Sequence, residues 1–241
     1  MPALREHLNL VAMALHRATV LRIGASLDAD EETVRASDAH LPAAGWVVGL
    51  AGCLAFALVG SVLRASAWGA LLAAVVATIV TATLTRGRAE TALFRTAERL
   101  QGLAAPGQSG SGALVLVLVL AAKFALLATL ASLSEPAVIA TLFAAHVVSR
   151  LAPLLLARSL GGDVPPHAVQ IGSAWCLVPL VLLLLVAGVS AVLVAVLAAV
   201  LACYGVWRLA RVQAEPVDRD LLAASQQVCE LAFYLGAAIG L

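Results

Sequence analysis

Two charged side chains lie inside long apolar segments of the sequence, where charge is costly. Lys123, the only lysine, stands ten residues into an apolar run, and Glu230 is followed by Leu-Ala-Phe-Tyr-Leu. A lysine at the centre of a bilayer costs about 2.5–3.5 kcal/mol on insertion scales. We therefore expect Lys123 to face either a polar cavity, where it contacts a phosphate or another anion, or a carboxylate partner. Glu230 in turn needs a cation, and Lys123 or a metal ion would serve.

Three polar residues near the end of the chain share one helix face. Asp220 and Gln227 are seven residues apart, and Gln227 and Glu230 are three apart, which are both helical repeats. The spacing predicts that their side chains project from one side of a terminal helix. Asp220 also stands near the expected start of this helix, where an aspartate can serve simply as an N-cap.

A second polar group lies near the end of another apolar run. Arg150 follows Ser149 directly, and His146 stands one helical turn earlier. A guanidinium fork matches phosphate oxygens, which makes Arg150 a candidate anion contact. Its position near the end of the run equally allows its charge to reach the membrane surface by snorkelling. For His146, a hydrogen bond between helices is the simpler interpretation.

The polar segment 86–112 interrupts the apolar sequence. Its first part contains Arg86, Arg88 and Glu90 in a pattern that predicts a short amphipathic helix with solvated charges. Its second part, Pro-Gly-Gln-Ser-Gly-Ser-Gly, predicts a flexible turn. Glycine-rich turns before helices can cradle phosphate through backbone N–H groups, although a plain linker is the simpler interpretation here.

The composition predicts an integral membrane protein. The chain has 241 residues, of which 62% are hydrophobic and 12% charged, whereas soluble domains are about 45–50% apolar and about 25% charged. The net charge of +1 provides no basic face for a nucleic-acid backbone. We therefore expect one membrane domain over 1–241, which excludes soluble enzymes, disordered chains and nucleic-acid binders.

The apolar runs predict an all-α, polytopic bundle of about six to seven transmembrane helices. About 20 apolar residues suffice to cross a bilayer. The run 171–207 contains 37 residues without charge, which is too long for one span, so we expect a hairpin that turns near Gly188. The amphipathic segment 5–22 is expected at the membrane interface. The expected spans are 43–63, 65–85, 113–134, 137–157, two within 171–207, and 221–241.

Positive charges are distributed unevenly between the two sides of this bundle. Cytoplasmic loops of membrane proteins carry an excess of lysine and arginine. Twelve of the fifteen cations fall on one side, in the segments 1–42, 86–112, 158–170 and 208–220. The asymmetry predicts a multi-pass protein with a cytoplasmic N-terminal segment and a cytoplasmic 86–112 loop, and we expect it in the cell inner membrane.

The oligomeric state is left open by the sequence. Gly45 and Gly49 are four residues apart in the first expected span, a spacing that allows close helix contacts. A homo-oligomer is one use of such a face.

The order of these features resembles the cobalamin synthase family, the membrane adenosylcobinamide-GDP ribazoletransferases, over nearly the whole chain. The stretch Pro42-Ala-Ala-Gly45-Trp-Val-Val-Gly49 is similar to the family's Pro-x-x-Gly-x-x-x-Gly entry into the first span. Lys123 matches a family lysine in the span after the catalytic loop, and Ser149-Arg150 matches a Ser-Arg pair in the next span.

Two further segments match the family's motifs only in part. The terminal helix of the family carries an Asp with Glu seven and ten residues later, and here the middle position is Gln227. The family's His-x-Asp-Gly-x-Ala-Asp-x-x-Asp-Gly loop is replaced by Leu84 to Phe94, in which Glu90 stands for one Asp. Arg86 and Leu93 occupy the two other acidic positions, and the family's later Asp-Ser-Arg-x-Gly-Thr segment is replaced by 105–110.

The resemblance implies a reaction that joins α-ribazole, or its 5′-phosphate, to adenosylcobinamide-GDP and releases GMP. It implies Mg²⁺, which takes oxygen ligands from one or two carboxylates and from substrate phosphates. A weakened family member that acts as a membrane scaffold or corrinoid-binding partner is the alternative. The implied site comprises Glu90, Asp220 and Glu230 as catalytic residues, Glu90 and Asp220 as Mg²⁺ ligands, and Arg86, Arg88, Lys123, Ser149, Arg150 and Gln227 as substrate contacts.

Overall fold

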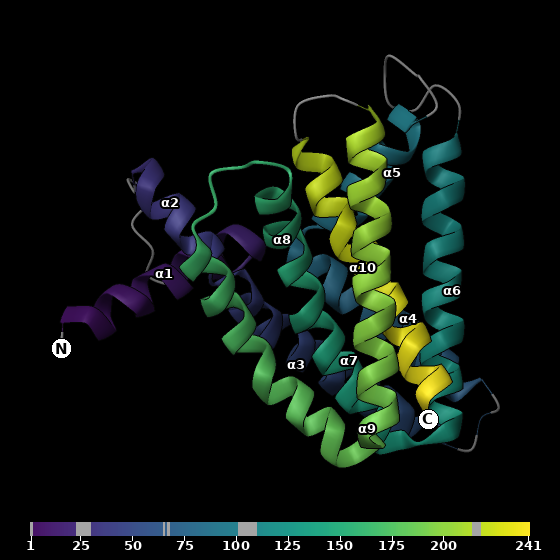
Figure 1. The fold of residues 1–241 in the computed structure, drawn as a ribbon. Helices are drawn as coiled ribbons and strands as arrows, with labels where there is room; N and C mark the ends of the chain where they lie inside the picture. Colours follow the sequence, from purple (N-terminus) through teal and green to yellow (C-terminus); the bar gives the residue numbers. More distant parts are fainter. Residues whose placement is uncertain (1, 23–29, 65, 67, 101–109, 214–217) are drawn as a thin grey trace.

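The described part of the chain is all-helical in the computed structural model, with no strand (Figure 1). This description covers every residue except 1, 23–29, 65, 67, 101–109 and 214–217. The elements are α1 (Pro2–Ala18), α2 (Glu31–Asp38), α3 (Leu41–Val62), α4 (Gly69–Thr85), α5 (Arg88–Leu100), α6 (Ser111–Leu133), α7 (Glu135–Val148), the 3₁₀ turn η1 (Ser149–Leu151), α8 (Ala152–Ser159), α9 (Pro166–Gln213) and α10 (Arg219–Gly240).

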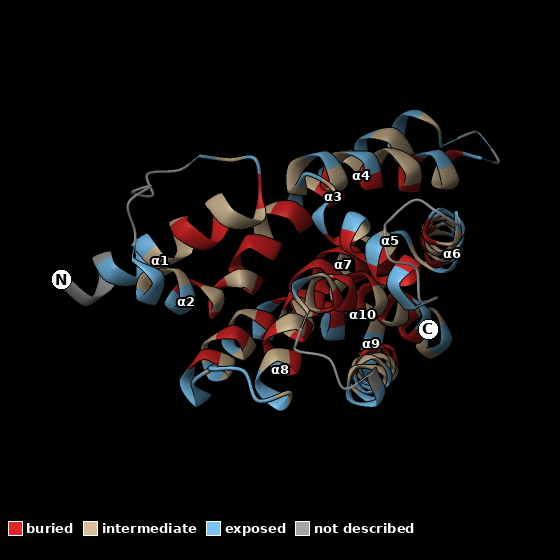
Figure 2. Cartoon of the chain, turned by 90° about the horizontal axis from the view of Figure 1, so that it is seen from above, coloured by how far each residue is buried: buried red, intermediate tan, exposed pale blue. Residues whose placement is uncertain are grey.

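α7 and α10 lie at the centre of the bundle, and the other long helices surround them (Figure 2). Both central helices bury side chains along much of their length. The outer helices α6 and α9 instead expose large apolar side chains, such as Leu118 and Leu193. A bundle with an apolar exterior and polar residues inside suits a lipid environment, so the predicted helical membrane bundle is confirmed.

In the described part of the chain, length and apolar character single out fewer continuous helices than the expected six to seven spans, but one of these helices, α9, consists of two stretches joined at Gly188. Among the described residues, four helical stretches are long and apolar enough, namely α3, α6, α7 continued through α8, and α9. A fifth is counted if α4 and α5, which meet at 89°, form one broken span. The central helix α10 does not pass this test. Its start is charged and Gln227 and Glu230 lie within it, which lowers its apolar character.

The expected hairpin within 171–207 is present, and its turn is at the predicted glycine. α9 is interrupted at Gly188, whose φ of 87° and ψ of 175° are not helical. Such backbone angles are essentially restricted to glycine. The two halves of α9 consequently run in different directions from this residue (Figure 1).

α5 turns back into the bundle instead of extending into solvent. α4 ends at Thr85, and the two residues after it, Arg86 and Gly87, both have positive φ angles; the Gly87 N–H donates to the Ala82 carbonyl oxygen. The predicted amphipathic helix is therefore present as α5, and its arginines are exposed as expected, but its glutamates are not fully solvated. Glu98 is buried, and its carboxylate accepts hydrogen bonds from the Gly112 N–H and the Ser111 hydroxyl at the start of α6.

The N-terminal helix α1 is exposed near its start and becomes buried toward its C-terminal half. Met13, Ala14 and Leu15 are buried, whereas Leu8 is exposed. Arg17 near its end donates hydrogen bonds to the Val34 carbonyl oxygen and to Asp38, which attaches α1 to α2.

Two glycines of α3, Gly45 and Gly49, allow this helix to pack closely against α7 of the same chain. A Cβ atom placed on Gly45 would lie 2.5 Å from the His146 carbonyl oxygen, and one on Gly49 would lie 3.0 Å from the Phe143 ring. Both glycines therefore face α7 of the same chain. Any association between copies of the protein has to use another surface.

Gly45→Ala is expected to lower the stability of the protein by about 1–3 kcal/mol, because overpacking at the α3–α7 contact forces the helices apart. Gly60→Ala, on the same helix, is the matched control because nothing lies within 4 Å of its added Cβ. Thermal unfolding in detergent should show a lower Tm for the first variant and an unchanged or higher Tm for the second. Equal behaviour of the two variants would contradict the close contact.

Candidate functional site

Two carboxylates, two cations and three polar side chains gather between the central helices and α5 and α6. We call them the charged cluster, and its members are Glu90, Lys123, His146, Arg150, Gln227, Glu230 and Tyr234. Because the two carboxylates balance the two cations, this group can be buried without a net charge.

Lys123 and Glu230 form the innermost part of the charged cluster. The Lys123 ammonium donates a hydrogen bond to Glu230 Oε1 at 2.6 Å, and the two side chains are only 3% and 1% exposed. The Tyr234 hydroxyl donates to the same oxygen at 3.0 Å. The structure therefore places a carboxylate beside Lys123, which is one of the two surroundings expected from the sequence.

His146 and Arg150 come from α7 and the turn that follows it. His146 Nδ1 lies 3.5 Å from Glu230 Oε2, yet neither ring nitrogen makes a hydrogen bond within the described residues. The Arg150 guanidinium donates to the His146 carbonyl oxygen and interacts electrostatically with Glu230 and Glu90. Arg150 is thus a buried cation held against the cluster's carboxylates and does not reach the surface by snorkelling.

Glu90 is the cluster's carboxylate with spare hydrogen-bonding capacity. Gln227 Nε2 donates to Glu90 Oε1 at 2.8 Å, which joins α5 to α10. Glu90 Oε2 is buried and has no partner among the described residues, and the same holds for the hydroxyl of Ser149. Unpaired buried oxygens are uncommon and call for an explanation, such as a ligand or catalytic role.

Asp220 does not join the charged cluster. Its carboxylate forms ion pairs with Arg99 at 3.1 Å and Arg95 at 3.8 Å, both on α5. The N-cap of α10 is Asp218, which accepts a hydrogen bond from the Asp220 backbone N–H, so the alternative role considered for Asp220 belongs to its neighbour. At 1.5 Å per residue, Asp220 lies about 10 Å along the helix axis from Gln227.

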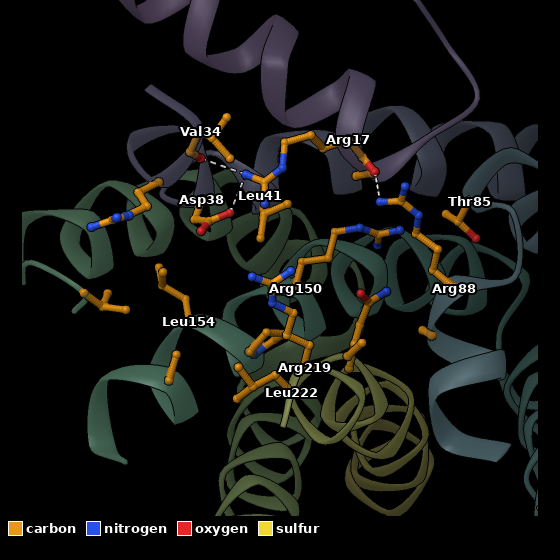
Figure 3. Close-up of a pocket in the computed structure, with 18 of the residues that line it drawn as sticks. Arg17, Val34, Asp38, Leu41, Thr85, Arg88, Arg150, Leu154, Arg219 and Leu222 are labelled. Carbon is orange, nitrogen blue, oxygen red and sulfur yellow. Dashed lines mark hydrogen bonds and ion pairs between the residues drawn. The ribbon is translucent and has the colours of Figure 1, made fainter. Parts of the chain in front are cut away.

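A cavity of about 740 Å³ opens beside the charged cluster, between the N-terminal helices, α5, α8 and the start of α10. Arg17, Arg88, Arg150 and Arg219 surround this space, and Leu154 and Leu222 form part of its wall (Figure 3). Arg150 belongs to both the cavity and the charged cluster. We call this space the arginine pocket.

The expected site residues therefore divide into several groups. Glu90, Lys123, Arg150, Gln227 and Glu230 are members of the charged cluster, and Ser149 is buried directly beside Arg150. Arg88 lines the arginine pocket, where it donates to the Arg17 carbonyl oxygen. Arg86 occupies the left-handed turn after α4 and is exposed, and Asp220 is ion-paired on α5.

A magnesium site held by several carboxylates does not fit the described residues. No group of three or more His, Cys, Asp and Glu close enough to share a metal ion occurs among them. Mg²⁺ ligands lie about 2.1 Å from the ion, so Glu90 and Asp220 would have to meet, but each is bonded elsewhere. Glu90 Oε2 is the available oxygen, and Lys123 and Arg150 interact with the same carboxylate.

The residues that sequence reasoning missed are Arg17 and Arg219. Arg17 is on α1, and Arg219 is the first residue of α10, so neither stands in an apolar run where its charge would attract notice. Both enter the pocket because α1, α5, η1 and α10 meet at one end of the bundle. No pattern of spacing in the sequence predicts this meeting.

The fold and the site together define a helical membrane protein with a buried, charge-balanced cluster that shares Arg150 with a basic pocket. A model of the family described as cobalamin-5-phosphate synthase matches residues 10–238, and the chain belongs to this family. No solved structure matches the chain.

Three relatives named adenosylcobinamide-GDP ribazoletransferase support the same assignment. The chain is 35% identical to the one from Albidiferax ferrireducens and 33% identical to the one from Polaromonas naphthalenivorans, each time over 86% of this chain and 88% of the relative. It is 31% identical to a third from Polaromonas sp., over 98% of this chain and 97% of the relative. The family resemblance seen in the sequence is therefore confirmed.

Proposed function

We propose that this protein is an adenosylcobinamide-GDP ribazoletransferase. It joins α-ribazole, or its 5′-phosphate, to the cobinamide phosphate of adenosylcobinamide-GDP and releases GMP. The observation that carries this proposal is that Arg150 connects a basic pocket, suited to phosphates, with a buried Glu90 oxygen that has no partner. The family membership and the names of the relatives support the same reaction.

The reaction is a displacement at phosphorus. A ribose hydroxyl oxygen of α-ribazole attacks the phosphorus that is bonded to cobinamide, and a new P–O bond forms. The bond from this phosphorus to the bridging oxygen of the diphosphate breaks, and GMP leaves with the electron pair. The hydroxyl proton passes to Glu90 Oε2. Such transfers depend mainly on positioning and on charge neutralisation, which arginines provide.

Mg²⁺ is proposed only as an ion that arrives on the substrate diphosphate. It would neutralise part of the phosphate charge without a bond to Glu90, whose one unpartnered oxygen, Oε2, receives the proton. Asp220 is a poorer candidate for a Mg²⁺ ligand than the family resemblance implies, because Arg95 and Arg99 already neutralise it.

We propose that the protein lies in the inner membrane and that its arginine pocket opens toward the cytoplasm. Most of the cations lie in segments on the pocket's side of the bundle, and cytoplasmic loops carry such an excess. Nucleotide substrates and GMP would then enter and leave from the cytoplasm.

The test is GMP release by the purified full-length protein in detergent with Mg²⁺, adenosylcobinamide-GDP and α-ribazole. We expect GMP only when both substrates are present. Release without α-ribazole would indicate hydrolysis instead of transfer. Corrinoid binding without any GMP release would contradict the proposal and favour a scaffold role.

A further inference from the structure

The arginine pocket carries more positive charge than its own carboxylates can balance. Its two acids are already paired, Asp38 with Arg17 at 2.7 Å and Glu31 with Arg35 at 3.0 Å. The other three arginines that line it have no ion pair with a carboxylate in the described part of the chain, and these are Arg88, Arg150 and Arg219. The pocket thus presents two guanidinium groups without a carboxylate partner among the described residues, Arg88 and Arg219, together with Arg150, whose charge the cluster's carboxylates balance in part.

These three cations come from different elements and meet only in the folded protein. Arg88 is the first residue of α5, Arg150 lies in η1, and Arg219 is the first residue of α10. Arg88 and Arg150 are each oriented by a hydrogen bond to a carbonyl oxygen, from Arg17 and His146 respectively. Such bonds orient a guanidinium without neutralising it, so its charge stays available to an anion.

The pocket also has an apolar wall. Val34, Leu41, Pro153, Leu154 and Leu222 line it together with the arginines. Small-molecule sites commonly have cavities of about 300–1,000 Å³ with apolar walls and a few placed polar groups, and the 740 Å³ of this cavity falls in that range. Cations beside an apolar wall suit a ligand that combines phosphate groups with a flat ring.

We propose that the arginine pocket binds the nucleoside diphosphate part of the corrinoid substrate, which rests on the proposed function. Arg88, Arg150 and Arg219 contact the diphosphate, and the base lies against the apolar wall. A diphosphate that is esterified at both ends carries one negative charge on each phosphate, so Arg88 and Arg219 can neutralise it while Arg150 adds a hydrogen-bond donor. Binding of the diphosphate therefore does not require a metal ion.

This placement also brings the diphosphate to the charged cluster. Arg150 interacts electrostatically with Glu90 and lines the pocket. A phosphate on Arg150 consequently contacts a guanidinium that also interacts with Glu90, and Ala89, which precedes Glu90, lines the same pocket. Arg17 of α1 and Val34 of α2 line the side of the pocket opposite Leu222 (Figure 3).

The test is binding of radiolabelled GDP to the full-length protein in detergent with EDTA, measured by equilibrium dialysis. Arg88→Gln and Arg219→Gln should each weaken GDP binding about 10–100-fold, as expected for loss of hydrogen bonds to a charged group. Arg158→Gln is the control, because Arg158 is also exposed but does not line the pocket, and it should change Kd less than twofold. Inorganic pyrophosphate should compete with GDP.

Three outcomes would overturn the inference. The first is that GDP binds only when Mg²⁺ is present. The second is that Arg158→Gln weakens GDP binding as much as Arg219→Gln does. The third is that the protein does not bind GDP at all. An unchanged Tm of the arginine variants excludes misfolding as the cause of weaker binding. Wild-type protein that binds GDP in this manner but releases no GMP from the full substrates would contradict the proposed function and leave this inference intact.

Discussion

Glu90→Gln is expected to slow GMP release by about 10²–10⁴-fold, the usual contribution of a positioned general base. The substituted amide keeps an oxygen that can accept the hydrogen bond from Gln227, so the α5–α10 contact persists. It loses the acceptor at Oε2, where the ribazole proton is proposed to go. The measurement is the single-turnover rate of GMP release with saturating substrates.

The control for this variant is Glu135→Gln, which also removes one carboxylate. Glu135 is exposed at the start of α7, at the opposite end of that helix from Arg150. We expect its rate to stay within about twofold of the wild type, as for surface changes away from special features. If Glu90→Gln kept the wild-type rate as well, another group would have to accept the proton.

Lys123→Met is expected to destabilise the protein by about 3–5 kcal/mol, because it leaves the Glu230 carboxylate buried without its cation. Methionine fills a similar volume, so the loss comes mainly from the unpaired charge. Thermal unfolding in detergent should show a clearly lower Tm, measured alongside the fraction of protein that elutes as a single species.

The double variant Lys123→Met/Glu230→Gln tests the cause of this loss. It removes both charges together and keeps an oxygen for the Tyr234 hydroxyl. We expect it to be more stable than Lys123→Met alone, since replacing a buried ion pair as a unit is often nearly neutral. A double variant less stable than either single variant would mean that packing, and not charge, dominates at this position.

The innermost ion pair was predictable from the sequence, because a lone lysine and a lone glutamate in apolar runs each need a partner. The turn at Gly188 was predictable for a similarly local reason, since 37 uncharged residues exceed one span. Of the three residues predicted to share a helix face, Asp220 and Gln227 both contact α5, whereas Glu230 contacts Lys123 of α6. Helical spacing predicts which residues share a face of the helix, but it does not predict which neighbouring residues each one meets along the helix axis. Asp220 ends up about 15 Å along the axis from Glu230, beside the arginines of α5.

The remaining features depend on tertiary structure. Glu90 meets Gln227 only because α5 bends 89° away from α4 and returns to α10. This bend follows from two consecutive residues with positive φ angles, and one of them is Arg86, which gives no sign of it in the sequence. Arg17 and Arg219 come together across about 200 residues of chain. Neither a motif nor a periodic pattern records contacts of this kind, so the arginine pocket could not be foreseen.

The most direct test of the proposed transfer uses α-ribazole that carries ¹⁸O in its ribose hydroxyl groups. After incubation with adenosylcobinamide-GDP and the protein, the masses of the corrinoid and nucleotide products are determined. Attack at the phosphorus bonded to cobinamide predicts that the label appears in a ribazole-containing corrinoid while the released GMP is unlabelled. Labelled nucleotide, or a corrinoid that never gains the ribazole mass, would contradict the account.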